Sequence, residues 1–303
     1  MSAIKIVYRD VDRTPYLYTL KHAAERYGLD LDVLKAPGRE YPELLEQGAA
    51  DFLAENYWGL QNFRARGVPL LSVATSVTSM NETLLVHPDV RELDDLRGKR
   101  FALRGMGPGE VVPKLWLKDQ GLGNDVTPVV ISEQEVGRWG NWKPVLAGDC
   151  HGCLITNLYA DEPMAAGLRV LPVEPYGMLG NVTLTTSEDF VAQRRDDVLG
   201  LVRAAFDANQ TFKHDRATTL EIMRREPMQL LEIADEPRLE RVYQILSAEL
   251  ADDPVPTATA IANTHRMVLD RYPELREFNP LLMWDLSFAR EVLRARRKSG
   301  SAD

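Results

Sequence analysis

The first 75 residues alternate between short apolar runs and segments with helical spacing, and this alternation constrains the fold more than any other feature. Apolar runs of strand length occur at residues 4–8, 29–34, 50–54 and 68–75. Helical spacing lies between them, at residues 17–27, 41–47 and 59–66. Strands that are repeatedly followed by helices predict a parallel sheet covered by helices. We therefore expect an α/β fold.

A second series of strand-like runs begins near residue 83 and ends near residue 186, and the sequence after Ser187 is almost entirely helical in pattern. A chain of 303 residues exceeds the usual span of one hydrophobic core. We expect residues 1–84 and 186–303 to form one discontinuous lobe with a helical C-terminal part, and residues 85–185 to form the second lobe. Each lobe should contain a mainly parallel sheet flanked by helices.

The stretch from Arg104 to Gly109 holds three glycines and a proline between a strand-like run and helix-like sequence. Backbone amides at a helix N-terminus, together with the positive end of the helix dipole, attract an anion. Arg104 could add a charged fork. We therefore expect Arg104, Gly105, Met106 and Gly107 to bind an anionic ligand, and an ordinary strand-to-helix turn is the alternative. No nucleotide-binding motif is present.

Charge and hydropathy exclude several classes of partner. The net charge is −9, and the basic residues gather only at residues 294–298, which we interpret as a solvated helix end. Because a nucleic acid needs a basic surface, no nucleic-acid partner is expected. No apolar stretch approaches the roughly 20 residues of a membrane helix, so no membrane insertion is expected. The sequence begins without an export signal, which predicts a cytoplasmic protein if this start is native. No organic cofactor is expected, and oligomeric partners are not indicated.

Cys150, His151 and Cys153 could form a metal site, because three suitable ligands lie within four residues. On an extended strand, however, alternate side chains point to opposite faces, so these ligands cannot converge without a turn. No second cysteine and histidine cluster completes a tetrahedral shell. We favour a buried strand that uses cysteine as a small apolar residue, predict no metal site, and keep the three residues as weak candidates.

Polar and aromatic side chains follow the predicted strands, where ligands of parallel sheets bind. Arg9, Asp10 and Arg13 follow the first strand, and the arginines could clamp a carboxylate. A solvated loop with internal ion pairs is the alternative, and it suits Asp12 and Arg13 better than Arg9 and Asp10. After the third strand come Glu55, Asn56, Tyr57 and Trp58. Burial beside aromatic rings would raise the pKa of Glu55 and make it a proton donor, while Tyr57 or Trp58 stacks on a flat ligand or merely covers the core.

The second lobe offers further ligand-binding candidates. Thr156 and Asn157 end the strand predicted at residues 150–156. Trp139 lies with Asn141 and Trp142 in a glycine-rich loop, where the tryptophans contact a ligand or cap the core. Tyr176 completes the set of candidates.

Several stretches resemble the type II periplasmic substrate-binding proteins of the sulfonate, nitrate and thiamine-precursor branch. These stretches are residues 94–102, 146–159, 166–171 and 186–190. The resemblance implies two lobes with the ligand in the cleft between them. Residues 10–15 and 41–51 resemble dihydroxyphthalate decarboxylase-like proteins of the same fold. That second resemblance implies an enzyme acting on a small, aromatic carboxylate.

Two functions follow from these resemblances. The first is a decarboxylase or related lyase without an organic cofactor. In this enzyme Arg9 and Arg104 would hold the anion, and Glu55 would protonate the developing carbanion. Asp10 belongs to the same group of candidate catalytic residues. In the second, the protein binds a small anion without turning it over, as a transporter's substrate-binding protein or as an intracellular sensor.

Overall fold

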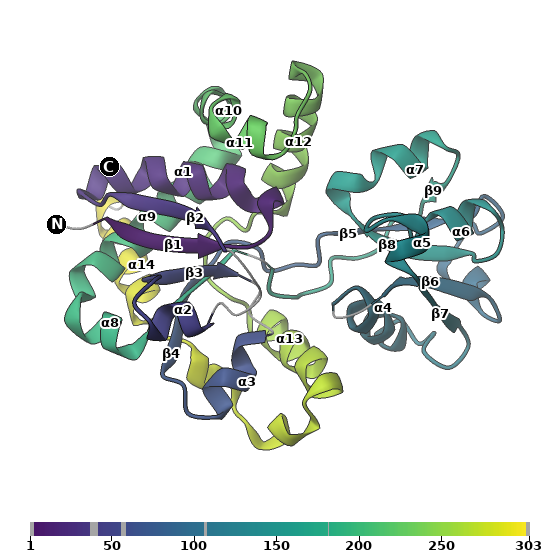
Figure 1. Cartoon of the computed structure of the whole chain (residues 1–303), viewed down its shortest axis with the longest axis horizontal. Helices are drawn as coiled ribbons and strands as arrows, with labels where there is room; N and C mark the ends of the chain where they lie inside the picture. The colour runs from purple at the N-terminus through teal and green to yellow at the C-terminus, as the bar shows by residue number, and fades with distance from the viewer. Residues whose placement is uncertain (1–2, 37–41, 56–58, 106–107, 181, 301–303) are drawn as a thin grey trace. The chain divides into compact units, whose positions relative to one another are not determined.

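The computed structural model describes residues 3–36, 42–55, 59–105, 108–180 and 182–300. The chain forms two compact units, one of residues 1–79 with 177–303 and one of residues 80–176. The boundaries expected from the sequence lay at residues 84 and 185. Each unit contains one five-stranded sheet flanked by helices (Figure 1), which confirms the two-lobed α/β class.

Unit 1, residues 1–79 and 177–303, has a sheet in the order β2-β1-β3-β10-β4. Its strands are β1 (Ile4–Tyr8), β2 (Leu31–Lys35), β3 (Phe52–Glu55), β4 (Leu70–Thr75) and β10 (Thr183–Ser187). β1 pairs in parallel with β2 and β3, whereas β10 is antiparallel to β3 and β4. The sheet is therefore mixed, because the strand that returns from unit 2 enters it in the opposite direction.

The helices between these strands are α1 (Thr14–Ala24), α2 (Pro42–Glu46) and α3 (Leu60–Ala65). The chain after β10 continues as α8 (Glu188–Gln193), α9 (Arg195–His214), α10 (Arg216–Arg224), α11 (Glu226–Leu230), α12 (Glu236–Glu249), α13 (Ala258–Arg271) and α14 (Ser287–Gly300). The predicted helix start at Ser187 is confirmed, since its side chain accepts a hydrogen bond from the Phe190 amide at 3.1 Å.

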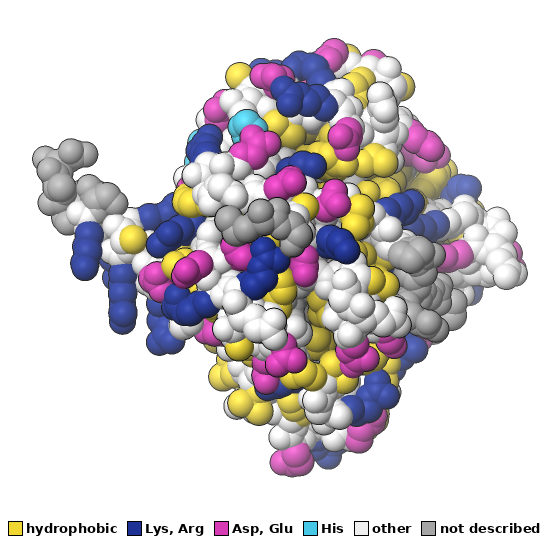
Figure 2. All heavy atoms as spheres, turned by 60° about the vertical axis from the view of Figure 1, so that its left-hand side comes forward, with side chains coloured by type: hydrophobic (Ala, Val, Ile, Leu, Met, Phe, Trp, Pro, Cys, Tyr) yellow, Lys and Arg dark blue, Asp and Glu magenta, His cyan; other side chains and the backbone are white. Residues whose placement is uncertain are grey.

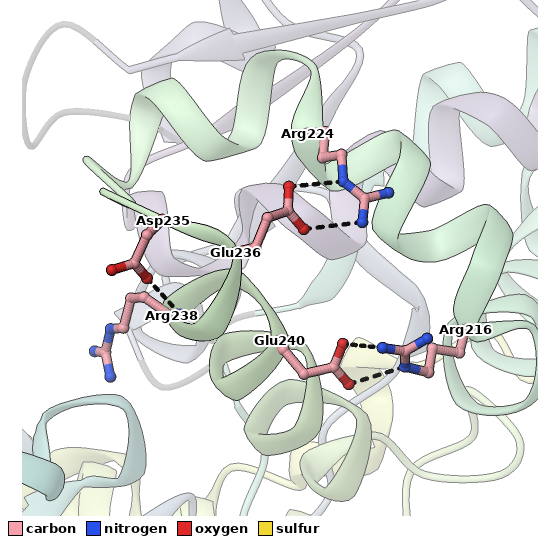
Figure 3. Close-up of polar contacts among 6 residues, drawn as sticks. All are labelled: Arg216, Arg224, Asp235, Glu236, Arg238 and Glu240. Atoms are coloured by element: carbon pink, nitrogen blue, oxygen red, sulfur yellow. Dashed lines mark hydrogen bonds and ion pairs between the residues drawn. The ribbon is translucent and has the colours of Figure 1, made fainter.

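Ion pairs tie α10 to α12 on the surface of unit 1 (Figure 3). Arg224 donates two hydrogen bonds to Glu236, both at 2.9 Å, and Arg216 pairs with Glu240 in the same two-pronged manner. Asp235 caps α12 by accepting from the Arg238 amide at 2.8 Å. These exposed pairs connect the two helices and contribute little to stability.

Unit 2, residues 80–176, has a sheet in the order β7-β6-β8-β5-β9. Its strands are β5 (Glu82–Val86), β6 (Arg100–Arg104), β7 (Thr127–Ile131), β8 (Gly152–Thr156) and β9 (Arg169–Val170). Its helices are α4 (Pro108–Asp119), α5 (Glu133–Val136), α6 (Lys143–Leu146) and α7 (Asp161–Ala165). β6 is parallel to β7 and β8, and β5 is antiparallel to β8 and β9.

Residues 11–16 are helical, whereas the sequence pattern, which places the first helix at residues 17–27, leaves residues 9–16 as a loop. A short 3-10 helix, η1 (Val11–Arg13), leads directly into α1 at Thr14. The fixed φ of Pro15 suits the first turn of α1, where its missing amide proton costs no hydrogen bond. The prediction of a loop was wrong because proline in a first turn starts a helix instead of interrupting one.

None of the described helices is both long enough and apolar enough to cross a membrane.

Substitutions in the core of unit 1 test whether β3 lies in the interior of the sheet. Phe52 on β3 is fully buried and meets the Phe190 ring edge-on at a centroid distance of 5.3 Å. Phe52→Ala should lower the free energy of unfolding by about 3–5 kcal/mol in urea titrations, because it leaves a cavity. Leu34→Ala on the edge strand β2, where the side chain is 39% exposed, should cost less than about 1 kcal/mol. Equal losses would contradict the assignment of β3 to the interior of the sheet.

Candidate functional site

Strand pairing in unit 2 brings four strand ends to one edge of the sheet. The parallel strands β6, β7 and β8 finish there at Arg104, Ile131 and Thr156. Since β5 is antiparallel, it begins at the same edge, and its first residue, Glu82, is the register partner of Thr156. The helix α4 starts just beyond Arg104, so its N-terminal amides belong to this edge as well.

An arginine and two aromatic rings form a layered stack at this edge. The Arg104 guanidinium lies 4.2 Å from the centroid of the Trp139 ring. On Trp139, the Tyr159 ring stacks at a centroid distance of 4.3 Å and an interplanar angle of 15°. This arginine–aromatic stack, made of Arg104, Trp139 and Tyr159, unites three segments that are distant in sequence. It offers a fixed positive charge beside flat apolar surface.

Two glycines allow the close packing around the stack. A Cβ on Gly109 would lie 2.7 Å from Arg104 Nε and 3.1 Å from the Arg104 carbonyl oxygen. A Cβ on Gly105 would lie 3.2 Å from the Ile131 carbonyl oxygen. The glycines therefore let Arg104 lie against the first turn of α4 and let the chain leave β6 beside β7. Contact of Gly105 with a ligand stays a prediction, and Met106 and Gly107 lie outside the described residues.

Glu82 is a site residue that the sequence predictions missed. Its Oε2 atom is shielded from solvent and has no hydrogen-bond partner among the described residues. Burial raises the pKa of Glu82, and the nearby Arg104 charge opposes that rise. A carboxyl group that retains its proton can donate a hydrogen bond to a ligand. The clue in the sequence is a glutamate that opens an apolar strand, but its position depends on the antiparallel direction of β5.

The other predicted residues of unit 2 have partners within the unit. Asn157 Oδ1 accepts from Thr83 Oγ1 at 2.7 Å, and Thr156 is buried at the end of β8. The Tyr176 hydroxyl donates to Asp119 Oδ2 at 2.7 Å. Contact of these side chains with a ligand stays a prediction.

Trp139 differs from its neighbours in the glycine-rich loop. Trp142 is buried in the core of the unit, and Asn141 Nδ2 donates to the Leu154 carbonyl at 3.1 Å. Trp142 therefore caps the core, whereas Trp139 belongs to the stack, and its contact with a ligand stays a prediction.

Cys150 and Cys153 are free cysteines buried in the core of unit 2. Burial raises the pKa of both thiols, which keeps them protonated and unreactive. His151 lies beside them with its ring centroid 6.0 Å from that of His87. No cluster of three histidine, cysteine, aspartate or glutamate residues that could hold a metal ion occurs in the described part of the chain.

The strand ends of unit 1 hold the remaining candidates. Glu55 ends β3, is 1% exposed, and is the register partner of Thr183 on β10. Arg9 and Asp10 follow β1 and form an ion pair at 4.0 Å. Their predicted catalytic roles stay predictions, and Asn56, Tyr57 and Trp58 lie outside the described residues.

Arg13 has a structural partner at the N-terminus of α1. Its guanidinium lies 2.5 Å from Glu249 Oε2 at the end of α12, and both side chains are buried. Asp12 is also buried. The alternative of a solvated loop for Asp12 and Arg13 was therefore wrong, because a carboxylate distant in sequence compensates the buried charge of Arg13. Binding of a ligand by Arg13 stays a prediction.

Comparison with known proteins gives a family and a fold. Residues 25–215 match the family described as NMT1/THI5 like. No curated protein matches the sequence.

Solved structures share the fold at low sequence identity. A periplasmic sulfonate-binding protein SsuA from Methylobacillus flagellatus KT is similar at a TM-score of 0.71 and 17% identity, over 98% of this chain and 95% of that chain. The aliphatic sulphonate binding protein SsuA from Escherichia coli is similar at a TM-score of 0.67 and 15% identity, over 93% of this chain and 96% of that chain. The desulfurization enzyme DSZB is similar at a TM-score of 0.64 and 15% identity, over 97% of this chain and 99% of that chain. Together with the family match, these likenesses confirm the predicted type II periplasmic-binding fold of the sulfonate, nitrate and thiamine-precursor branch.

The protonation of Glu82 can be tested through stability. A raised pKa means that the folded protein keeps a proton that the unfolded chain has lost. Stability should therefore fall as pH rises from the ordinary glutamate pKa of about 4.3 through the raised pKa of Glu82. Glu82→Gln stays neutral and should lose less stability over that window in urea titrations at a series of pH values.

Glu133→Gln in α5 is the matched control, because this glutamate is exposed in the same unit. It should keep the pH dependence of the wild type. An unchanged pH dependence in Glu82→Gln would show that Glu82 titrates like an exposed carboxyl.

Proposed function

The chain belongs to the NMT1/THI5-like family, and from that premise we propose that it is a binding protein for a small organic anion. The observation that carries the proposal is the arginine–aromatic stack, where Arg104 presents its charge at the edge at which strand ends and the start of α4 converge. Arginine pairs with carboxylate and sulfonate oxygens through parallel N–H donors. The sulfonate-binding proteins that share the fold bind a ligand of this chemistry.

The ligand should combine an acidic group with an apolar body. The acidic group would sit on Arg104 and the amides of α4, and the body would lie along Trp139 and Tyr159. Glu82, next to Arg104, would favour a ligand with a further acceptor when the carboxyl is protonated. These contacts name the class of ligand, an organic sulfonate or carboxylate. The expectation that unit 1 grips the same molecule stays a prediction.

Arg104→Ala should weaken binding of benzenesulfonate and benzoate by roughly 10- to 100-fold, because a charged hydrogen-bond donor is lost. Isothermal titration calorimetry with both probes and with butanesulfonate measures this and shows whether an aromatic body matters. Arg100→Ala is the matched control, since Arg100 lies on the same strand at the opposite edge of the sheet. It should leave affinity unchanged. Equal losses in the two variants, or no binding of any probe, would refute Arg104 as the anchor.

Catalysis by a decarboxylase or related lyase is the second candidate function. Glu55 favours it, because this carboxyl group is almost completely buried at a strand end of unit 1. The desulfurization enzyme DSZB supports it too, since an enzyme has the same fold. A buried carboxylic acid can protonate a carbanion as carbon dioxide leaves.

Glu55→Gln discriminates between the two functions. A binding protein should release no carbon dioxide from benzoate or phthalate, in either the wild type or the variant, and any affinity for these acids should be kept. If the wild type decarboxylates one of them and Glu55→Gln abolishes turnover while retaining binding, the enzyme function replaces the first proposal.

A further inference from the structure

A concave surface lies in unit 1, along the C-terminal helix α14 and beside the first residue of α9. It is an open groove with a volume of about 550 Å³, within the range of small-molecule sites. The charged residues that line it are Arg195, Arg290, Glu291, Arg294 and Lys298. We call this surface the α14 groove, and it shares no residue with the strand-end candidates.

The α14 groove carries an excess of positive charge. The acidic residue Glu291 already forms two ion pairs, one from Oε2 to Arg195 Nη2 at 3.0 Å and one from Oε1 to Arg203 Nη2 at 3.8 Å. Arg290 and Arg294 are exposed, and neither has an ion-pair partner among the described residues. On the face drawn in Figure 2, basic side chains gather at the left of the view, while positive and negative side chains are interspersed elsewhere. The groove itself is lined by four basic side chains and one acidic side chain, and so differs from the mixed charge that is usual on a protein surface.

Helix stability does not account for these cations. Arg290, Arg294 and Lys298 are four residues apart, which places like charges on one face of α14, where they repel. The helix dipole favours Lys298 in the last turn, but it does not stabilise Arg290 and Arg294, which lie outside both end turns of α14. A bound anion would relieve the repulsion.

The groove is fixed in place by packing. Phe288 and Val292 on the other side of α14 are buried, and the Arg195 guanidinium lies 5.1 Å from the centroid of the Phe288 ring. Arg296 points away from the groove, donating to Asp207 at 2.7 Å. Because α14 is anchored in this way, the backbone positions of the groove's arginines are fixed before any ligand arrives, which reduces the entropy cost of binding.

We propose that the α14 groove is a separate binding site for a small phosphate-bearing polyanion. Arginine forks bind phosphate oxygens through paired N–H donors, and several cations in one groove suit a ligand with several negative groups. The net charge of −9 disfavours a long nucleic acid, whose charge would meet the acidic remainder of the surface. The enclosed volume likewise suits a small molecule more than a membrane.

Calorimetric titration of the full chain with inorganic tripolyphosphate at low salt tests this site. The wild type should bind, and Arg290→Ala combined with Arg294→Ala should weaken binding roughly 10-fold or more. Replacing the same two residues by lysine should give an intermediate affinity, because the charge stays but the fork is lost. Equal melting temperatures would verify that the variants are folded.

The matched control combines Arg91→Ala with Arg276→Ala, two exposed arginines outside the groove, and makes the same change in net charge. It should change affinity by less than about twofold. Absence of binding by the wild type, or equal losses in the control and in the groove variant, would overturn the proposal. Binding to phosphatidylglycerol vesicles that tripolyphosphate does not displace would overturn it in favour of a membrane surface.

Discussion

Unit 1 depends on the pairing of β10 between β3 and β4. β10 comes back from unit 2 and closes the centre of a sheet whose other strands lie more than 100 residues earlier. Buried hydroxyls hold this closure, with Thr75 Oγ1 3.0 Å from Thr183 Oγ1 and Ser72 Oγ 2.8 Å from Thr185 Oγ1. Loss of that pairing would expose two edge strands and separate the early strands from the C-terminal helices. The discontinuity of the chain is thus a condition for the sheet.

The same mixture of strand directions creates the candidate site in unit 2. Parallel strands bring Arg104 and Thr156 to one edge, and the antiparallel β5 adds Glu82 there. Because β8 continues into Tyr159, an aromatic ring reaches Trp139 and completes the layer under Arg104. The cation and the carboxyl group therefore come from the separate strands β6 and β5, whose positions the sheet fixes, while the rings come from the segments that follow α5 and β8. A rigid arrangement of this kind would bind the proposed anion with little reorganisation.

Local pattern predicted the elements well, since β1 at Ile4–Tyr8 has the expected bounds and β4 at Leu70–Thr75 lies within the run expected at residues 68–75. Predictions failed where distant partners decide the outcome. Arg13 is buried because Glu249, far along the chain, compensates its charge, and no local pattern reveals that pair. Glu82 was missed because strand direction, which period-2 patterning does not encode, determines the edge it occupies. Arg104 and Trp139 were both predicted as ligand-binding residues, whereas their contact with each other depends on tertiary packing.

The central claim is that Arg104 anchors a small organic anion, and native mass spectrometry of freshly purified protein tests it most directly. We expect a fraction of the wild type to carry a bound mass that is released on denaturation and identified as an organic sulfonate or carboxylate. The same preparation of Arg104→Ala should lack that mass, while Arg100→Ala should retain it. A retained metal ion or polyamine, or an acid held equally by Arg104→Ala, would contradict the account.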